Sequence, residues 1–374
     1  MSGQAVKTLL LSQKDLINVG VMDMGDCINV IEDVFSLLGR GDYLMGGPLE
    51  NEHGQMIFFP DNERFPGMPV TGPDRRFMSM IAYLGGKYKI CGEKWYGSNP
   101  ANTQRGLPRS ILTVILNDAD TGIPFTIMSG NLISAMRTGA VPGVAAKHLA
   151  RKNAKCVGLL GGGVINRATL LAIKTAVPAI ESAILYDINM EKGKAWAKEE
   201  SEKLAISVTA TDDIKEAVCN ADILSIATGG HSVPRVETEW LKPGALVVFT
   251  GDAEFDPDAF INNTVIADNW KMHQAFLEDA KESPKGMDAI SVVAPSFHLL
   301  EAIVAGKYDE KNIRNLGDIV NKKVPGRQNE DEIIMFMTGG MPLHDIAWGK
   351  TLYDRAVEKG LGTEYCFFDE AYWR

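Results

Sequence analysis

A run of glycines between an apolar segment and a helical stretch is the first feature of this sequence that could do chemistry. The apolar segment Cys156 to Leu160 leads into Gly161 to Gly163, and helical periodicity follows. In the pattern GxGxxG, the first two glycines fall on Gly161 and Gly163, while Asn166 stands where Gly or Ala is usual. Such a turn directs backbone N–H groups and a helix N-terminus at a pyrophosphate. A purely structural strand-to-helix turn is the alternative.

An acidic residue at the end of the next predicted strand favours the nucleotide interpretation. Asp187 follows Tyr186 and lies 21 residues after Asn166, close to the spacing of about 20 at which a carboxylate holds the adenosine ribose. A helix N-cap is the other role open to Asp187. Because a carboxylate repels a 2′-phosphate, NAD is predicted as cofactor and NADP is the less favoured alternative. Thr228, after the fourth strand, is expected at the crevice that the cofactor crosses, and a plain glycine turn is the alternative.

The elements that must position these residues alternate regularly from Lys155 onward. Short apolar runs alternate with helical stretches, a pattern that predicts βαβ units and a parallel sheet. The predicted strands are 156–160, 183–186, 207–208, 223–227, 245–249, 265–266 and 333–337. A helix is expected near His344 to Lys359.

The first third of the chain has another pattern. Short apolar runs separated by turn residues between Arg76 and Met128 predict an antiparallel sheet. A strand or turn and an amphipathic helix are expected within residues 1–40, and a long loop or strand-and-loop excursion over 42–73. A long helix is predicted from Asn131 to Leu149.

Composition limits the class of protein. The 374 residues are 45% hydrophobic and 23% charged, which fits a soluble globular protein of about two domains and excludes disordered, collagen-like and coiled-coil classes. The formal charge of −10 disfavours nucleic-acid binding. The longest uncharged stretch, Thr121 to Met136, falls short of the roughly 20 residues that cross a membrane, so no membrane partner is expected.

Cysteine usage indicates the compartment. The five cysteines are widely spaced and form no CxxC pair, so no zinc or redox site is predicted and no metal is expected. Reduced thiols in a cytoplasmic protein are the simplest interpretation.

From Arg76 to Phe367 the chain resembles the ornithine cyclodeaminase/mu-crystallin family. The resemblance depends on an ordered series of motifs, which includes the glycine turn: Ala82 to Gly86, Glu93 to Trp95, Gly106 to Pro108, Asp120 to Pro124, Arg137 to Ala140, Leu241 to Gly244, Gly251-Asp252 and Gly360 to Thr363. It implies an α/β fold in which a Rossmann domain, residues 138–342, is inserted into an α+β domain. That second domain, residues 1–137 plus 343–374, is expected to bind substrate and form a homodimer.

The resemblance also assigns roles to individual residues. Lys94 corresponds to the substrate-binding lysine, and Arg137 to an arginine near both the cofactor phosphate and the substrate carboxylate. Asp252, after the strand at 245–249, corresponds to the catalytic aspartate that moves the amine proton; capping of a short helix is its alternative role. The implied cofactor contacts are Arg137, Thr138, Gly161, Gly163, Val164, Ile165, Asp187, Ile188 and Thr228.

Departures from the family pattern concern the substrate. Met80 matches an active-site methionine, but Met78 stands where ornithine cyclodeaminases carry the glutamate that holds a distal ammonium, and an unpaired buried ammonium is costly. The family's early carboxylate-binding arginine has no clear counterpart in the segment 51–59; candidates to replace it are Arg75, Arg76 and Arg109, with Arg109 chosen for the substrate site. Ile165 replaces a glutamine near the cofactor.

Three functions follow from the resemblance. The first is an NAD-dependent oxidoreductase that interconverts a small amino acid and its imine. The second is a cyclodeaminase that recycles NAD and releases ammonia, and the third is a crystallin-like protein that binds the nucleotide without turnover. Loss of the glutamate at Met78 favours the first, and retention of Lys94 and Asp252 disfavours the third.

Overall fold

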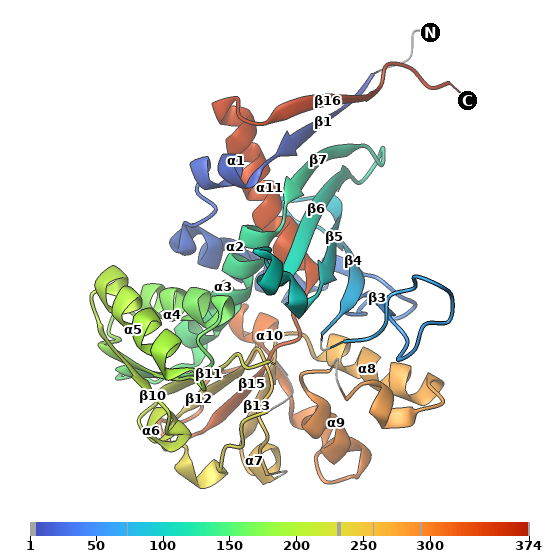
Figure 1. Ribbon diagram of the computed structural model, residues 1–374. Helices are drawn as coiled ribbons and strands as arrows, with labels where there is room; N and C mark the ends of the chain where they lie inside the picture. Colours follow the sequence, from blue (N-terminus) through green and yellow to red (C-terminus); the bar gives the residue numbers. More distant parts are fainter. Residues whose placement is uncertain (1–4, 73, 230–232, 257, 292–293, 373–374) are drawn as a thin grey trace. The chain divides into compact units, whose positions relative to one another are not determined.

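The computed structural model describes residues 5–72, 74–229, 233–256, 258–291 and 294–372 (Figure 1). The chain divides into two compact units. Unit 1 comprises Met1–Asp23, Asp42–Arg137 and Met341–Arg374, and unit 2 comprises Met24–Gly41 and Thr138–Gly340. The predicted division placed residues 24–41 with the first unit. Helix α2 (Met24–Arg40) instead packs against α4 (Val164–Ala176) and α10 (Leu316–Val320), both of unit 2.

Unit 1 is built on a mixed sheet whose central strands are consecutive and antiparallel. Strands β4 (Arg76–Leu84), β5 (Ile90–Ser98), β6 (Ser110–Asp118) and β7 (Pro124–Ser129) pair in chain order. The edges are β2 (Tyr43–Met45) and β3 (Gln55–Phe58), which pair with β4, and β1 (Val6–Leu11), which runs parallel to β7 and antiparallel to β16 (Thr363–Phe368). The predicted antiparallel region is therefore present, and the described part of the predicted excursion, residues 42–72, consists of short strands and loops.

Helix α11 (Pro342–Lys359) covers one face of this sheet and packs against β4, β5 and β6. Its first turns approach the strands closely, because a Cβ at Gly92 would lie 2.7 Å from Ile346 Cγ2 and 2.9 Å from the carbonyl oxygen of Ile115. Only glycine therefore fits at this position of β5. Because side chains alternate along a strand, Lys94, two residues further on, is on the same covered face. The short helix α1 (Gln13–Asn18) also belongs to unit 1.

Unit 2 contains a parallel sheet of eight strands. The order is β10-β9-β8-β11-β12-β15-β13-β14, formed by β8 (Cys156–Leu160), β9 (Ser182–Tyr186), β10 (Ser207–Thr211), β11 (Ile223–Ile226), β12 (Leu246–Phe249), β13 (Thr264–Ala267), β14 (Arg314–Asn315) and β15 (Ile334–Met337). Every residue of β11, β12 and β15 is buried, as expected for strands covered on both faces. The order reverses between β8 and β11, which is the switch point of a Rossmann fold. The predicted fold class is confirmed.

Helices surround this sheet: α3 (Asn131–Leu149), α4, α5 (Met190–Leu204), α6 (Ile214–Cys219), α7 (Asp258–Ile261), α8 (Trp270–Glu282), α9 (Phe297–Val304) and α10. Helix α3 begins in unit 1 and ends in unit 2. Within the described ranges, no helix combines the length and apolar character needed to cross a membrane.

Candidate active site

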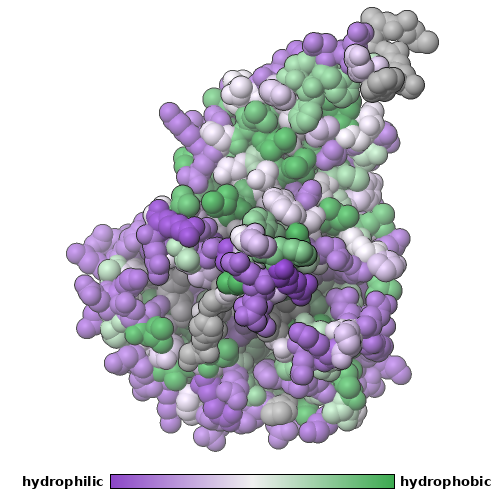
Figure 2. All heavy atoms as spheres, turned by 45° about the vertical axis from the view of Figure 1, so that its right-hand side comes forward, coloured by the Kyte–Doolittle hydropathy of each residue, from purple (hydrophilic) through white to green (hydrophobic). Residues whose placement is uncertain are grey.

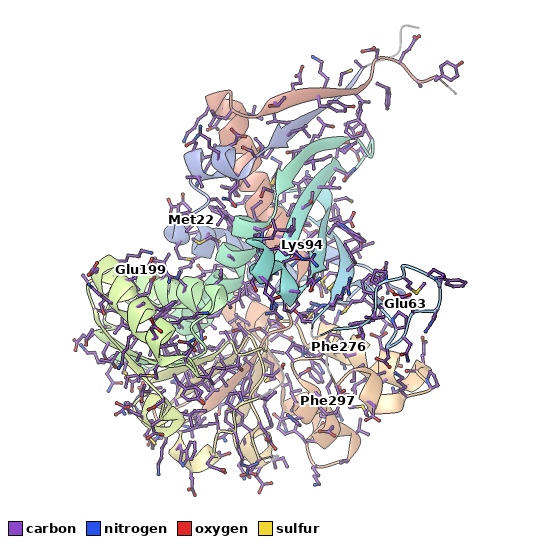
Figure 3. All side chains as sticks on the ribbon, viewed as in Figure 1. Met22, Glu63, Lys94, Glu199, Phe276 and Phe297 are labelled. Carbon is purple, nitrogen blue, oxygen red and sulfur yellow. The ribbon has the colours of Figure 1, made fainter. Side chains whose placement is uncertain are left out.

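A buried group of charged side chains lies in unit 1, on the sheet face that α11 covers. Lys94, on β5, and Arg137, on α3, both approach the carboxylate of Asp345 in the first turn of α11. Lys94 Nζ lies 3.1 Å and Arg137 Nε 3.0 Å from the same oxygen, Asp345 Oδ2. The three residues are 3%, 5% and 0% exposed, so these are pairs within the protein interior. Figure 3 labels Lys94 among the strands of unit 1.

Asp345 was not among the residues predicted from the sequence. Both of its oxygens are buried, and neither has a hydrogen-bond partner in the part of the chain that the structure describes, so its contacts with Lys94 and Arg137 are ion pairs. A carboxylate in the first turn of a helix is favoured by the helix dipole. The signal available in the sequence was an Asp among apolar residues near the start of a predicted helix, and that signal alone does not distinguish a buried carboxylate from an exposed one.

His344 precedes Asp345 and is also fully buried. Burial, followed by the positive charges of Arg137 and Lys94, holds the pKa of His344 well below its ordinary value. The imidazole is therefore neutral at physiological pH and adds no positive charge to the group.

Burial also changes the ionisation of Lys94. Loss of solvent is the largest effect and, together with the charge of Arg137, it lowers the pKa of Lys94 to about 8, although Asp345 acts in the opposite direction. At neutral pH the group therefore holds two positive charges around one negative charge. The remaining positive charge suits an anionic ligand such as a carboxylate.

The two predicted methionines line the same face of the sheet. Met80 is paired across the strands with Lys94, and Met78 with Tyr96; both methionines are buried. The ring of Tyr96 has Lys94 Nζ 5.7 Å from its centroid. The surroundings of Lys94 are thus thioether and aromatic at these two positions, and neither Met78 nor Met80 carries a charge.

Arg109, the predicted replacement for the early arginine, lies in a second charged group of unit 1. Its guanidinium is paired with Asp74, which also pairs with Arg76 and accepts a hydrogen bond of 3.0 Å from Ser98 Oγ. Arg75 instead donates to the carbonyl oxygen of Val70. Of the three candidate arginines, Arg76 and Arg109 therefore share a carboxylate and Arg75 lies elsewhere.

In unit 2, the predicted glycine turn joins β8 to α4. Gly161 has a φ of 95°, in the region that favours glycine, and Gly163 is the N-cap of α4. No side chain of the described residues caps this helix, and a Cβ at Gly163 would meet no atom within 4 Å. Free N–H groups facing open space fit a pyrophosphate. Val164 and Ile165 form the first turn, with Val164 exposed.

Asn166 has a structural reason to replace the third glycine. It is completely buried, and its amide nitrogen donates to the carbonyl oxygens of Leu160 and Gly161 at 2.9 and 2.8 Å. Its amide oxygen accepts a hydrogen bond of 2.7 Å from Ser225 on β11. Asn166 thus fixes the turn to both strands at the switch point.

Asp187 lies directly at the glycine turn. Its carboxylate accepts a 2.8 Å hydrogen bond from the backbone N–H of Gly162 and another of 2.8 Å from that of Asn189. The next residue, Ile188, is 90% exposed, and it offers an apolar surface beside the carboxylate. A ribose at Asp187 with its base against Ile188 matches the two chemical parts of an adenosine.

Thr228 and Asp252 lie together at the carboxyl edge of the same sheet. The Thr228 hydroxyl donates to the main-chain carbonyl oxygen of Asp252, and the two residues follow β11 and β12 respectively. Partial burial raises the pKa of Asp252, an effect that the charge of His298 opposes. A carboxylate with a raised pKa is suited to proton transfer.

The structure thus groups the predicted site residues into two sets. Lys94, Arg137, Met78 and Met80 lie around Asp345 and Tyr96 in unit 1, with Thr138 following Arg137 in α3, and Arg109 lies at Asp74. The other set, in unit 2, comprises Gly161, Gly163, Val164, Ile165, Asp187, Ile188, Thr228 and Asp252. The second set fits NAD by its open helix terminus and by the carboxylate of Asp187 beside the glycine turn. Across the described ranges, no cluster of His, Cys, Asp and Glu could hold a metal.

Comparison with known proteins identifies the family of this chain. The profile of the ornithine cyclodeaminase/mu-crystallin family matches residues 21–360. This chain belongs to that family. The resemblance inferred from the motifs is therefore confirmed, over a longer part of the chain than the motifs covered.

Members of the family with known structure or activity are similar over most of the chain. The N-((2S)-2-amino-2-carboxyethyl)-L-glutamate dehydrogenase of Staphylococcus aureus is 30% identical over 292 residues, 77% of this chain and 81% of that protein. The Thermococcus litoralis Δ1-pyrroline-2-carboxylate reductase, solved with NADH and L-proline, has a TM-score of 0.77 and 30% identity, and the match covers 95% of this chain and 99% of that one. An archaeal alanine dehydrogenase dimer with bound NAD has a TM-score of 0.77 at 25% identity, with 97% and 100% coverage.

Proposed function

We propose that this protein is an NAD-dependent oxidoreductase that interconverts a small amino acid and its imine. The observation that carries the proposal is the buried group in which Lys94 and Arg137 share one oxygen of Asp345. It retains one positive charge for a substrate carboxylate. The similar dehydrogenases and the similar reductase, of which two are solved with NAD or NADH, support the same reaction class.

Each set of residues has a distinct part in this reaction. Lys94 and Arg137 bind and orient the substrate carboxylate. The helix terminus at Gly163 and the carboxylate of Asp187 hold the dinucleotide. When bound, NAD would supply the hydride acceptor for the substrate's α carbon, and NADH would supply the hydride donor in the reducing direction. Asp252 accepts the amine proton during oxidation and returns it during reduction.

A cyclodeaminase is the second candidate function. It would form the same imine, but a distal amine would then attack it and ammonia would leave. Buried Met78, opposite Tyr96, offers no charge to a distal ammonium, which favours net oxidation and reduction. A binding protein without turnover is the third candidate, and the presence of both Lys94 and Asp252 speaks against it.

Incubation with NAD and a panel of amino acids separates these functions. Formation of NADH, followed by its near-ultraviolet absorbance, is expected for the oxidoreductase. Release of ammonia without net NADH would indicate the cyclodeaminase, and tight NAD binding without either product would indicate the binding protein. The reverse reaction, with NADH and a cyclic imino acid, checks the reducing direction.

We also propose that the protein is a homodimer that uses the open face of the unit 1 sheet. Phe77, Ile81, Trp95 and Ile111 are exposed on the face opposite α11, and Phe77 stacks on Trp95 with ring centroids 5.8 Å apart. Figure 2 shows apolar side chains gathered over unit 1, in the upper part of the picture. Exposed apolar surface of this kind commonly marks an interface. A cytoplasmic location is proposed because the five cysteines are widely spaced and form no CxxC pair.

A further inference from the structure

We propose that the substrate is a dicarboxylic amino or imino acid whose second carboxylate is bound by Arg76 and Arg109. This inference rests on the proposed function and narrows it to a substrate class. The three features that support it are the strand register, the position of Tyr96 and the balance of charge around Asp74.

The strand register puts the two charged groups of unit 1 on one face of the sheet. Across β4 and β5, Met80 pairs with Lys94, Met78 with Tyr96, and Arg76 with Ser98. Alternate residues of a strand share a face, so the side that carries Lys94 next carries Tyr96 and then Arg76 and Ser98. A substrate anchored by its α-carboxylate at Lys94 and extended along the strands meets these side chains in order.

Tyr96 connects the two groups. Lys94 Nζ lies 5.7 Å and Arg76 Cζ 5.9 Å from the centroid of its ring. Its hydroxyl oxygen accepts hydrogen bonds of 3.3 and 3.2 Å from Nε and Nη2 of Arg76. The phenol thus holds the Arg76 guanidinium beside the ring that Lys94 contacts, and its own O–H is available to donate to an acceptor oxygen.

The positive charges around Asp74 exceed its negative charge by one. Two guanidiniums, those of Arg76 and Arg109, share this single carboxylate. Burial is the largest cause that lowers the pKa of Arg109, and the nearby charge of Arg76 lowers it further. Arg109 is about half exposed along its side chain, so a ligand can reach it.

A carboxylate is the anion that fits this excess. Guanidinium groups bind carboxylates in a fork with two parallel hydrogen bonds, and one carboxylate neutralises the single excess charge. A phosphate, with a charge of about −1.5 to −2, would exceed it. The group around Asp345 also retains one positive charge. Two carboxylates on one substrate therefore neutralise both groups, and Met78 between them accommodates the connecting carbons.

Equilibrium binding tests the substrate class without requiring turnover. Succinate and butyrate, which have the same number of carbons, are titrated into NADH-loaded protein by calorimetry. Succinate is expected to bind about tenfold or more tightly, as a charge-assisted hydrogen-bonded pair provides. Equal affinities, or binding of neither acid, would overturn the inference.

Three variants and a control assign the effect to this cluster. Arg76→Gln and Arg109→Gln should reduce the preference for succinate towards unity and leave butyrate binding unchanged. Asp74→Asn should increase the preference, because it removes the competing carboxylate. Arg105→Gln, an exposed arginine of the neighbouring 3-10 helix Pro100–Arg105, should change neither. If Arg76→Gln does not fold, Arg109→Gln and Asp74→Asn still test the inference. A preference for succinate over butyrate that none of these variants alters would refute the inference.

Turnover distinguishes failure of this inference from failure of the proposed function. The values of kcat/KM are compared for aspartate against 2-aminobutyrate and for glutamate against norvaline. NADH formation that favours the monocarboxylic member of each pair would refute the substrate class and leave the oxidoreductase intact. Absence of NADH binding would refute the proposed function itself.

Discussion

The ammonium of Lys94 and the carboxylate of Asp345 lie 3.1 Å apart with almost no exposure to solvent. One belongs to the middle strand of a sheet and the other to the first turn of the helix that covers it. A buried lysine without this partner would favour its neutral form. Asp345 thus keeps Lys94 charged and, by binding Arg137 through the same oxygen, fixes the relative position of the two cations.

The ionisation of Lys94 should appear in the pH dependence of the reaction. Only the protonated ammonium attracts a carboxylate, and the pKa of Lys94 is about 8 in the ligand-free protein. We expect kcat/KM to fall as pH rises through about 8, because this parameter reports the ionisation of the free enzyme. A kcat/KM that stays constant from pH 7 to about 10 would remove the assigned role of Lys94.

Replacement of Asp345 by Asn should move the fall of kcat/KM to lower pH. Asp345 raises the pKa of Lys94, so its neutralisation lowers that pKa further, and the KM for the amino acid should rise about tenfold or more at neutral pH. Asp345→Glu should restore part of the affinity. Asp354→Asn, at an exposed position of the same helix, is the control. If Asp345→Asn reduces activity but kcat/KM still falls at the same pH as in the wild type, the role of Asp345 is purely structural.

Asp252→Asn tests the proton-transfer step. The amide cannot accept a proton, so turnover should decrease by about 10²-fold or more while NAD affinity stays nearly the same. Because burial raises the pKa of Asp252, the acid limb of the wild-type oxidative reaction should lie above the ordinary range of an aspartate. Glu254→Gln, at an exposed position, serves as control, and wild-type rates in Asp252→Asn would exclude the role.

Asp187→Ser tests the choice of cofactor. The serine removes the charge that repels a 2′-phosphate and the acceptor for the Gly162 N–H, so NAD should bind more weakly and the preference for NAD over NADP should fall about tenfold or more. Fluorescence titration with NADH and NADPH measures both affinities. Asp212→Ser, at an exposed position after β10, is expected to retain the wild-type preference. An unchanged preference in Asp187→Ser would place the adenosine elsewhere.

A charge on the open sheet face should disrupt the proposed dimer. Ile81→Glu places a carboxylate among Phe77, Trp95 and Ile111, where burial of an unpaired charge is costly. Light scattering after size exclusion should give the mass of two chains for the wild type and of one for the variant. Ile17→Glu, exposed on α1, should remain dimeric. A monomeric wild type would contradict the proposal directly.

The parallel sheet could be predicted from the sequence because its strands are continuous apolar runs that end at glycines, aspartates or threonines. Strand β14 could not, because it has only two residues and exists through its pairing with β13. The helix Met24–Arg40 shows a clear apolar stripe, which predicts burial but not the partner. Its contacts with α4 and α10 depend on tertiary packing, so the sequence favoured the wrong unit.

The site could be predicted only where a motif fixes local geometry. The glycine turn and Asp187 are related by strand and turn spacing, and the structure joins them by a hydrogen bond. Asp345 has no such local pattern, since its partners Lys94 and Arg137 come from a strand and another helix. The clustering of Arg76 and Arg109 on Asp74 likewise depends on strand register, which a single sequence does not specify.

The group formed by Lys94, Arg137 and Asp345 is completed late in the synthesis of the chain. All of unit 2 precedes Asp345 along the chain, and domains fold as units during translation. A nascent polypeptide on the ribosome can therefore complete its nucleotide-binding half while Lys94 and Arg137 still lack their shared counter-ion. Under the proposed function, the amino acid site would be completed only after helix α11 emerges, so a chain terminated ahead of that helix would lack the carboxylate that holds Lys94 and Arg137 together.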